Sequence, residues 1–260
     1  MPELPEVATF QKYFDLAAIG RRVMALEVLE PRVLTVSPEQ LQQTVVGQRW
    51  ESSQRIGKHL LVELSEGGWM SIHFGMTGSL RSFKDREDMP RFIKVLFTLD
   101  DGFYLGFRCP RLLGRIGLVD SIGKYQQVKR LGPDALAVSW ENFQAQFARR
   151  KGLVKPLLMN QTVVAGLGNW IVDEVLYQAG IHPEKRADQL SEAEVRAIYD
   201  KMQYILETAV RLESRYEDFP DDFLVTYRWS KNQHRQDEIN LKRFKVGGRS
   251  TYIDAERQQL

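Results

Sequence analysis

A proline stands beside two carboxylates in the first residues of the chain, and processing can leave this proline at the N-terminus. Pro2 follows Met1, and an initiator methionine is commonly removed before a residue this small, which would leave a free secondary amine. Such an amine titrates at a pH of about 8, so an appreciable fraction is an unprotonated nucleophile at neutral pH. Glu3 and Glu6 lie beside it. The same residues also suit a proline-led entry to a helix over residues 7–17, and this alternative stays open.

A second stretch with chemical potential, residues 161–183, joins a glycine turn to a helix. Gly166 and Gly168 precede a run in which apolar residues recur at helical spacing. Asn169 is therefore predicted to be the N-cap, and Gly180 is predicted to end the helix. A helix N-terminus presents unpaired N–H groups and the positive end of the dipole, so the turn predicts a phosphate site. An ordinary helix hairpin with glycines for close packing is the alternative.

Three loops in the first half of the chain carry unusual polar residues. They read R-I-G-K-H over residues 55–59, H-F-G-M-T-G over residues 73–78 and R-C-P-R over residues 108–111. Each loop alone is compatible with an ordinary solvated connection. Together they are predicted to bring cations and an apolar wedge to one edge of a β-sheet.

Eight short runs rich in β-forming residues, separated by glycines, indicate that this sheet belongs to a β-sandwich. The runs cover residues 23–29, 48–53, 60–64, 69–74, 79–83, 92–99, 103–107 and 116–119. Asp101-Gly102 is a strong hairpin signal between the sixth and seventh runs. A short capped helix is expected to begin at Ser37-Pro38.

The second half of the chain changes to a helical period after a predicted linker over residues 123–134. Ser139 is predicted to cap one helix, and Ser191 opens a capping-box pattern for a longer one. Residues 241–254 predict a β-hairpin with Arg249 at or beside its turn. The fold class is therefore predicted to be α+β.

Composition is that of an ordinary globular protein, since 43% of the 260 residues are hydrophobic, 27% are charged and the net charge is +2. From residue 225 onward eight Lys or Arg face four Asp or Glu, whereas residues 212–222 hold five acids and one Arg, which predicts a locally basic C-terminal surface. The single cysteine, Cys109, excludes an intrachain disulfide and a cysteine-rich zinc site, so we expect no metal and no cofactor. No run approaches the length of a membrane span, so a soluble, intracellular protein is expected.

Five motifs follow one another along the chain: M-P-E-L-P-E-V, R-I-G-K-H-L, H-F-G-M-T-G-S-L, the block from K-G-L-V-K-P to A-G-I-H-P, and G-G-R-S-T. In this order they resemble the formamidopyrimidine-DNA glycosylase and endonuclease VIII family of base-excision repair enzymes. The resemblance covers essentially the whole chain. It implies an N-terminal two-sheet β-sandwich over residues 1–124, a linker over 125–135, a helix-two-turns-helix domain over 136–232 and a finger hairpin over 233–260.

The resemblance implies a bifunctional DNA glycosylase and abasic-site lyase that excises oxidised or ring-opened bases from damaged double-stranded DNA. Pro2 is implied to attack the sugar C1′ and form a Schiff base that leads to β,δ-elimination, and Glu3 to protonate the opening ribose. Glu6 is implied to be a supporting carboxylate, and Lys58 is grouped with these catalytic residues. The residues implied to grip backbone phosphates are Lys58, His73, Asn169 and Arg249. Those implied to fill the space left by a flipped nucleotide are Met76 and Arg111.

Three features depart from the family pattern. No cysteines accompany the G-G-R-S motif, so the finger is expected to be a zincless hairpin held by packing alone. Leu113 stands where the corresponding loop usually carries an aromatic wedge, which leaves recognition of the opposite base open. Residues 213–222 leave little material for the loop that covers flipped 8-oxoguanine in some members, which argues against activity on that base.

Two alternatives to a repair enzyme stay open. One is a non-catalytic or specialised damaged-DNA-binding member of the family, and the other is an RNA-binding module that shares only the helix-two-turns-helix. Intact Pro2, Glu3 and Lys58 weigh against the first, and the full-length match weighs against the second. We expect a monomer that works with the chromosome, in the nucleoid of a bacterium or the nucleus of a eukaryote.

Overall fold

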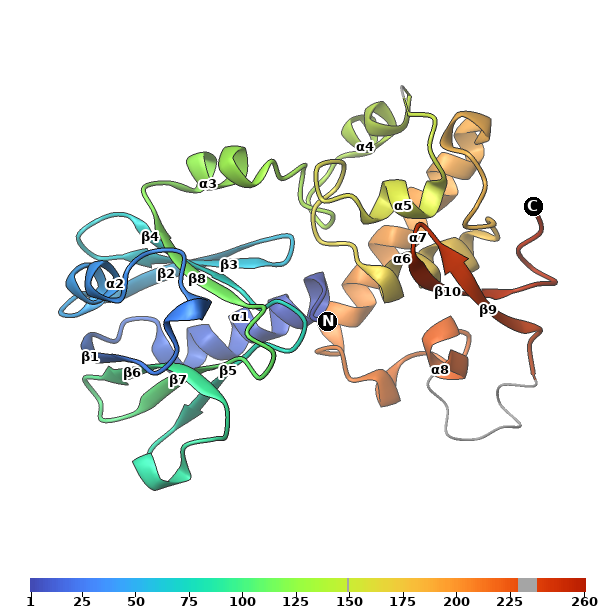
Figure 1. Ribbon diagram of the computed structural model, residues 1–260. Helices are drawn as coiled ribbons and strands as arrows, with labels where there is room; N and C mark the ends of the chain where they lie inside the picture. Colours follow the sequence, from blue (N-terminus) through green and yellow to red (C-terminus); the bar gives the residue numbers. More distant parts are fainter. Residues whose placement is uncertain (149, 229–237) are drawn as a thin grey trace. The chain divides into compact units, whose positions relative to one another are not determined.

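The computed structural model describes residues 1–148, 150–228 and 238–260, and the chain divides into two compact units (Figure 1). The N-terminal unit comprises Met1–Pro2 and Glu6–Lys129, and the C-terminal unit comprises Glu3–Pro5 and Arg130–Leu260. A single peptide bond therefore joins Pro2 of one unit to Glu3 of the other. No helix in the described ranges combines the length and the hydropathy that a bilayer span requires.

Two four-stranded antiparallel sheets form most of the N-terminal unit, which confirms the predicted sandwich. The first sheet has the order β1-β6-β7-β5, with β1 at Val23–Val28, β5 at Ser79–Phe83, β6 at Ile93–Leu99 and β7 at Tyr104–Arg108. The second has the order β2-β3-β4-β8, with β2 at Trp50–Ile56, β3 at His59–Leu64, β4 at Trp69–His73 and β8 at Arg115–Val119. Each strand overlaps one of the predicted runs.

Aromatic side chains join these sheets to helix α1 (Leu4–Ala18), which lies between them (Figure 1). The ring of Trp50 on β2 lies 5.2 Å from that of Phe14 on α1 and 5.3 Å from that of Phe97 on β6, measured between centroids. All three side chains are almost fully buried. Burial of aromatic and aliphatic side chains on both inner faces therefore builds the core of this unit.

Short helices complete the N-terminal unit, and one of them lies where a linker was predicted. Helix α2 (Pro38–Val45) begins as expected, with the Ser37 hydroxyl accepting from the backbone N–H of Gln40. Helix α3 (Ile122–Lys129) occupies much of the segment predicted to be a linker. Its glycine and polar residues give it no clear apolar period, and the buried side chain of Tyr125 anchors it instead.

The C-terminal unit is helical except for one hairpin. Its helices are α4 (Trp140–Phe147), α5 (Val154–Met159), α6 (Asn169–Ala179), α7 (Glu192–Arg211) and α8 (Leu224–Arg228), and its strands are β9 (Leu241–Val246) and β10 (Arg249–Asp254). Single 3₁₀ turns lie at Pro31–Val33, Arg86–Asp88, Ala187–Gln189 and Tyr216–Asp218. The capping box predicted at Ser191 is present at the start of α7. The domain limit predicted between residues 232 and 233 lies outside the described residues.

Helix α6 is the centre of this unit, because every residue from Trp170 to Gln178 is buried. A helix covered on all sides is normally apolar on all sides, yet α6 contains Asp173 and Glu174. Buried carboxylates are costly unless hydrogen-bonded partners accompany them. Their partners connect α6 to α5, α8 and the hairpin.

Candidate active site

Glu3 lies at the N-terminus of α6, with 2% of its surface exposed. Its Oε1 accepts the backbone N–H of Trp170 at 3.1 Å, and its Oε2 accepts that of Ile171 at 3.3 Å. A carboxylate is well suited to this position because the helix dipole and the unpaired N–H groups both favour negative charge. The anion at this helix end is thus the chain's own Glu3, and the prediction of a phosphate held by these backbone N–H groups is corrected.

The two glycines of the preceding turn make room for the N-terminal residues of the chain. A Cβ on Gly168 would lie 2.2 Å from Cδ of Glu3, and one on Gly166, where φ is +119°, would lie 2.5 Å from Cδ1 of Leu4. The backbone N–H of Leu4 also donates to the carbonyl oxygen of Gly166 at 3.1 Å. Gly168, not Asn169, is the N-cap, because the carboxylate of Glu3 does what a capping side chain would otherwise do.

The other predicted catalytic side chains lie in the N-terminal unit. Pro2 is half-buried beside an exposed Met1, and Glu6 is half-buried in the first turn of α1. Lys58 stands with Gly57 in the two-residue turn between β2 and β3, and only 9% of its surface is exposed. Although Lys58 lies at the tip of a hairpin, its side chain is largely covered, so its ammonium group is held in place and is not freely solvated.

Strand pairing places His73 close to this turn. His73 ends β4 and lies opposite His59 of β3 on one side and Arg115 of β8 on the other. Its Nδ1 accepts the backbone N–H of Gly75 at 3.3 Å, so a neutral ring carries its hydrogen on Nε2. The structure therefore brings Lys58 and His73 to the same end of one sheet, with a hydrogen-bond donor on each.

Met76 and Arg111 come from two loops that pack backbone against backbone. A Cβ on Gly75 would lie 2.4 Å from the carbonyl carbon of Leu113, so only glycine permits this approach. Met76 is 39% exposed, Leu113 is 45% exposed and Arg111 is exposed as well. The two loops thus present apolar and cationic side chains together, as the sequence predicted for one edge of a sheet.

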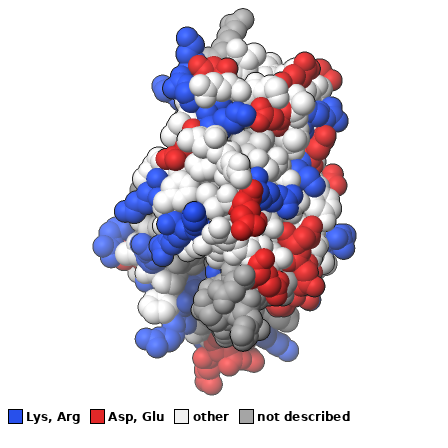
Figure 2. Space-filling model, turned by 90° about the vertical axis from the view of Figure 1, so that its right-hand side faces the viewer, with Lys and Arg blue, Asp and Glu red and all other residues white. Residues whose placement is uncertain are grey.

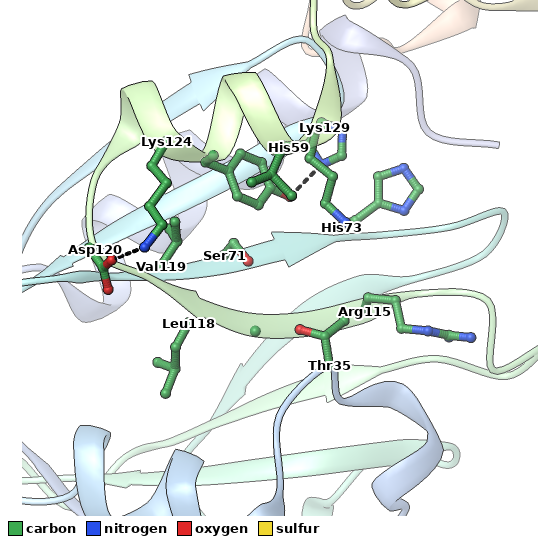
Figure 3. Close-up of a pocket in the computed structure, with 13 residues that line it drawn as sticks. Thr35, His59, Ser71, His73, Arg115, Leu118, Val119, Asp120, Lys124 and Lys129 are labelled. Atoms are coloured by element: carbon green, nitrogen blue, oxygen red, sulfur yellow. Dashed lines mark hydrogen bonds and ion pairs between the residues drawn. The ribbon is translucent and has the colours of Figure 1, made fainter.

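An open pocket of about 520 Å³ lies between α3 and the second sheet of the N-terminal unit (Figure 3). The rings of His59 and His73 line it with centroids 4.7 Å apart, and the Tyr125 hydroxyl lies 2.8 Å from Nδ1 of His59. Burial is the main cause that lowers the pKa of His59 to about 3 and that of His73 to about 4. The nearby ammonium groups of Lys58 and Lys129 act in the same direction. Both imidazoles are therefore neutral at physiological pH.

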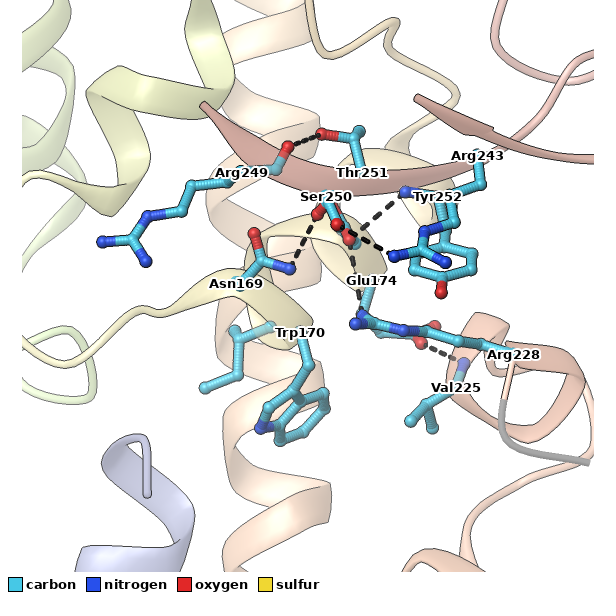
Figure 4. Close-up of polar contacts among 12 residues, drawn as sticks. Asn169, Trp170, Glu174, Val225, Arg228, Arg243, Arg249, Ser250, Thr251 and Tyr252 are labelled. Carbon is cyan, nitrogen blue, oxygen red and sulfur yellow. Dashed lines mark hydrogen bonds and ion pairs between the residues drawn. The ribbon is translucent and has the colours of Figure 1, made fainter. Parts of the chain in front are cut away.

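Arg249 begins β10 directly after a turn formed by Gly247 and Gly248, whose φ angles are +56° and +76°. Two successive positive φ angles are typical of the tight hairpin turns that glycine favours, so the predicted hairpin is confirmed. The Arg249 side chain is exposed and points away from the hairpin (Figure 4). Asn169, on the first turn of α6, donates from Nδ2 to the carbonyl oxygen of Ser250 at 2.9 Å.

Comparison with known proteins shows which family this arrangement belongs to. The family model of the formamidopyrimidine-DNA glycosylase N-terminal domain matches residues 1–116. The family model of the formamidopyrimidine-DNA glycosylase H2TH domain matches residues 131–219. The chain belongs to the formamidopyrimidine-DNA glycosylase family. A formamidopyrimidine-DNA glycosylase of Pelotomaculum thermopropionicum is 33% identical over 97% of each chain, and one of Arabidopsis thaliana is 31% identical over all of this chain and 71% of its own length.

The similarity in fold extends over essentially the whole chain. The crystal structure of Lactococcus lactis formamidopyrimidine-DNA glycosylase, noncovalently bound to DNA that contains an abasic site, superimposes with a TM-score of 0.85 at 26% identity. The match covers 99% of this chain and all of that one. Membership places the chain among the DNA glycosylases of base-excision repair.

The hairpin of this glycosylase does not have the ligands for a zinc finger. Residues 241–260 contain neither cysteine nor histidine, and the single cysteine, Cys109, is buried in the N-terminal unit. Zinc in structural sites is held by four thiolate or imidazole ligands, so the residues present do not fit it. The sequence predicted a hairpin held by packing alone, and this prediction is corrected. The buried pair of Lys155 and Asp173 contacts the hairpin directly.

Several polar residues around this site were not predicted from the sequence. Lys155, Asp173 and Glu174 are at most 2% exposed. Glu174 accepts the backbone N–H groups of Leu224 and Val225 at 3.0 and 2.9 Å and so caps α8. Burial raises its pKa to about 7. The sequence did contain a signal for a buried polar network, because two adjacent acids stand inside the apolar run W-I-V-D-E-V-L-Y and charges within an apolar helix need partners.

The buried histidine pair predicts a loss of stability in acid. In the folded protein the pKa of His59 is about 3, whereas in the unfolded chain it returns to about 6.5, so the unfolded state binds the extra proton as the pH falls below 6.5. Replacing His59 with Gln keeps an acceptor for Tyr125 and removes the titration. When the pH falls from 7.5 to 5, the free energy of unfolding should decrease in both proteins. The decrease should be about 1–2 kcal/mol smaller in the variant, a figure that allows for the partial exposure of His59.

Urea unfolding at the two pH values measures this difference, and comparison with the parent cancels the contributions of titrating groups that do not interact with His59. His182→Gln, in the C-terminal unit, is the matched control and should retain most of the acid loss. An acid loss that is unchanged in His59→Gln would show that His59 does not carry it.

Proposed function

We propose that the protein is a bifunctional DNA glycosylase and abasic-site lyase that uses the amine of Pro2 as its nucleophile. The attachment of Glu3 to the N-terminus of α6 carries this proposal, because it fixes a carboxylate one residue from that amine. A nucleophile with a neighbouring acid is the arrangement that covalent catalysis at a sugar carbon requires. Chromosomal DNA that contains oxidised or ring-opened bases is the proposed substrate.

In the proposed reaction the Pro2 nitrogen forms a bond to C1′ while the bond from C1′ to the damaged base breaks, and the departing base takes a proton from water. The Glu3 carboxylate accepts the proton that the Pro2 nitrogen loses and delivers it to the ribose ring oxygen, so the sugar opens to an iminium ion on Pro2. Loss of a proton from C2′ expels the 3′ phosphate, and a further elimination expels the 5′ phosphate. Glu6 supports the charge on the amine, and hydrolysis of the iminium releases the enzyme.

Cationic and neutral donors from both units are proposed to hold the DNA backbone. Lys58, His73, Asn169 and Arg249 supply an ammonium, an imidazole N–H, an amide and a guanidinium, which are all donors that suit phosphate oxygens. Figure 2 shows one face of the molecule, on which Lys and Arg side chains are interspersed with Asp and Glu side chains but are more frequent toward the left edge.

Met76 and Arg111 are proposed to enter the duplex when the damaged nucleotide leaves the base stack. Their loops pack against one another through Gly75 and the backbone of Leu113, so the two side chains project from adjoining segments of backbone. An apolar wedge and a cation together replace lost stacking and lost hydrogen bonds. Leu113 is exposed in the same loop and adds aliphatic rather than aromatic surface.

Borohydride reduction in the presence of an abasic-site duplex tests this function directly, because it converts the iminium on Pro2 into a stable covalent bond. We expect a covalent complex with this duplex and none with a duplex that carries a tetrahydrofuran analogue, since the analogue has no C1′ hydroxyl and cannot open to an aldehyde. Tight binding of both duplexes without any covalent product would favour the non-catalytic alternative. Duplexes with different damaged bases would then define the substrate.

A further inference from the structure

Lys155 on α5 is a fully buried lysine whose ammonium group has three partners. Its Nζ lies 2.6 Å from Oδ1 of Asp173, 2.8 Å from Oγ1 of Thr251 and 3.1 Å from the carbonyl oxygen of Ser250. An ammonium has three N–H groups, and this geometry uses all of them. One partner is on α6 and two are on β10, so Lys155 joins three elements that are far apart in the sequence.

The carboxylate of Asp173 completes the connection between α6 and the hairpin. Its Oδ2 accepts the backbone N–H of Tyr252 at 3.4 Å and lies 3.5 Å from Nη1 of Arg228. Burial raises the pKa of Asp173 to about 6 and lowers that of Lys155, while their mutual attraction opposes both changes. The carboxylate is therefore ionised at neutral pH and forms an ion pair with Lys155.

The carbonyl of Ser250 links this ion pair to two residues proposed to grip DNA. It accepts from Lys155. It also accepts from Nδ2 of Asn169 at 2.9 Å, and Ser250 directly follows Arg249 in β10 (Figure 4). Within residues 1–148, 150–228 and 238–260, no side chain forms an ion pair with the exposed Arg249 guanidinium. One carbonyl group thus sets the position of Asn169 relative to Arg249.

The hairpin needs such an anchor because it is short. An isolated two-stranded hairpin is at best marginally stable in water, and this one buries mainly Val246, Thr251 and Ile253. Apolar burial holds the hairpin against α6 but leaves its register along the helix less strictly defined. A buried ammonium with three directed hydrogen bonds accepts only one register.

We infer that Lys155, paired with Asp173, is a positioning residue that holds the β9–β10 hairpin where Arg249 and Asn169 can grip the same stretch of DNA backbone. This inference rests on the proposed function, since it assigns Arg249 a phosphate as partner. Lys155 is fully buried and does not contact DNA itself, and its effect on binding passes through Ser250.

The test removes both charges of the pair together, because a single substitution would leave the other charge of the pair buried without its partner. In Lys155→Met with Asp173→Asn, the new amide still accepts from Tyr252 while the donor to Ser250 is lost. Arg228 loses the Asp173 carboxylate in this variant but keeps its contact with the ring of Tyr252. Binding is measured against salt concentration with a duplex that carries the tetrahydrofuran analogue. We expect about a tenfold weaker affinity and a salt slope lower by about one, the same changes as in Arg249→Ala, because one phosphate contact is lost in each case.

A double-mutant cycle separates positioning from a general loss of stability. Added to Arg249→Ala, the paired substitution should weaken binding little further, since the contact that it disturbs is already absent. Ile205→Ala, in the buried core of α7, is the matched control and should lower Tm without a change in the salt slope. Full additivity with Arg249→Ala, or a folded paired variant with the parent's slope, would overturn the inference.

Amide hydrogen exchange distinguishes failure of this inference from failure of the proposed function. In the paired variant the amide of Thr251 should lose protection, while those of α7 keep it. A parent protein that binds no DNA would refute the proposed function and leave this exchange difference standing. Unchanged protection in the hairpin would refute the anchor, even where the parent binds and cleaves DNA normally.

Discussion

A short extension fused to the N-terminus of the chain should abolish covalent trapping and strand cleavage while binding of an abasic-analogue duplex persists. The extension prevents removal of Met1 and so keeps the Pro2 nitrogen in a tertiary amide, which has no nucleophilic lone pair. Met1 is 52% exposed, so residues added before it do not have to displace the core. Gel analysis after borohydride reduction and denaturation measures the covalent product, and we expect it to fall to background.

The same extension fused to the C-terminus is the matched control and should leave trapping at the level of the parent. Removal of the N-terminal extension by a protease that exposes Pro2 should restore activity. If the extended protein, with its extra residues confirmed by intact mass, still trapped abasic DNA, another amine would have to be the nucleophile.

Replacing Glu3 with Gln should lower base excision by about 10²–10⁴-fold, the range typical of a lost general acid, while cleavage at a preformed abasic site falls far less. The difference arises because an abasic aldehyde is already open and needs no acid to expel a base. Single-turnover kinetics on a lesion duplex and on an abasic duplex measure the two steps separately. The ratio of the two losses is the decisive quantity.

The structure adds a complication to this variant, because Glu3 also caps α6. The amide introduced by Glu3→Gln would place an NH₂ group opposite the backbone N–H of Trp170 or Ile171, so a loss of stability of about 1–3 kcal/mol is expected beside the kinetic effect. Thermal melting quantifies it, and Glu6→Gln, in the first turn of α1, serves as a carboxylate control. Equal losses in both steps would make Glu3 a residue that positions Pro2, and Glu6 would become the better candidate for the acid.

The two sheets were predictable because their signals are local. Runs of β-branched and aromatic residues between glycines occur at all eight strands, and Asp101-Gly102 marks the turn between β6 and β7. The capping box at Ser191 and the Gly247-Gly248 turn are equally local. Helix α3 was missed because contacts of Tyr125 with residues far along the chain hold it, and no sequence period reports such contacts.

The candidate site was predictable as a set of residue types and less so as a set of contacts. The turn at Gly166 and Gly168 indicated an anion at a helix N-terminus, and an anion is there, but it is the carboxylate of Glu3, a residue from the far end of the sequence. A local pattern specifies that donors are available, whereas the partner depends on which segment folds onto them. The same holds for Lys155, whose partners lie on α6 and β10.

The sequence by itself determined the family, the α+β class and the positions of the strands and the main helices, and it indicated the group of side chains proposed to act on DNA, because motifs, periodicity and turn residues are local properties. Only the tertiary structure decided that Glu3 caps α6, that His59 and His73 are neutral neighbours, and that a buried pair of Lys155 and Asp173 supports a hairpin without zinc ligands. Each of these depends on burial and on contacts between distant segments. Burial determines the charge that a titratable group carries, and the chain acquires it only when it folds.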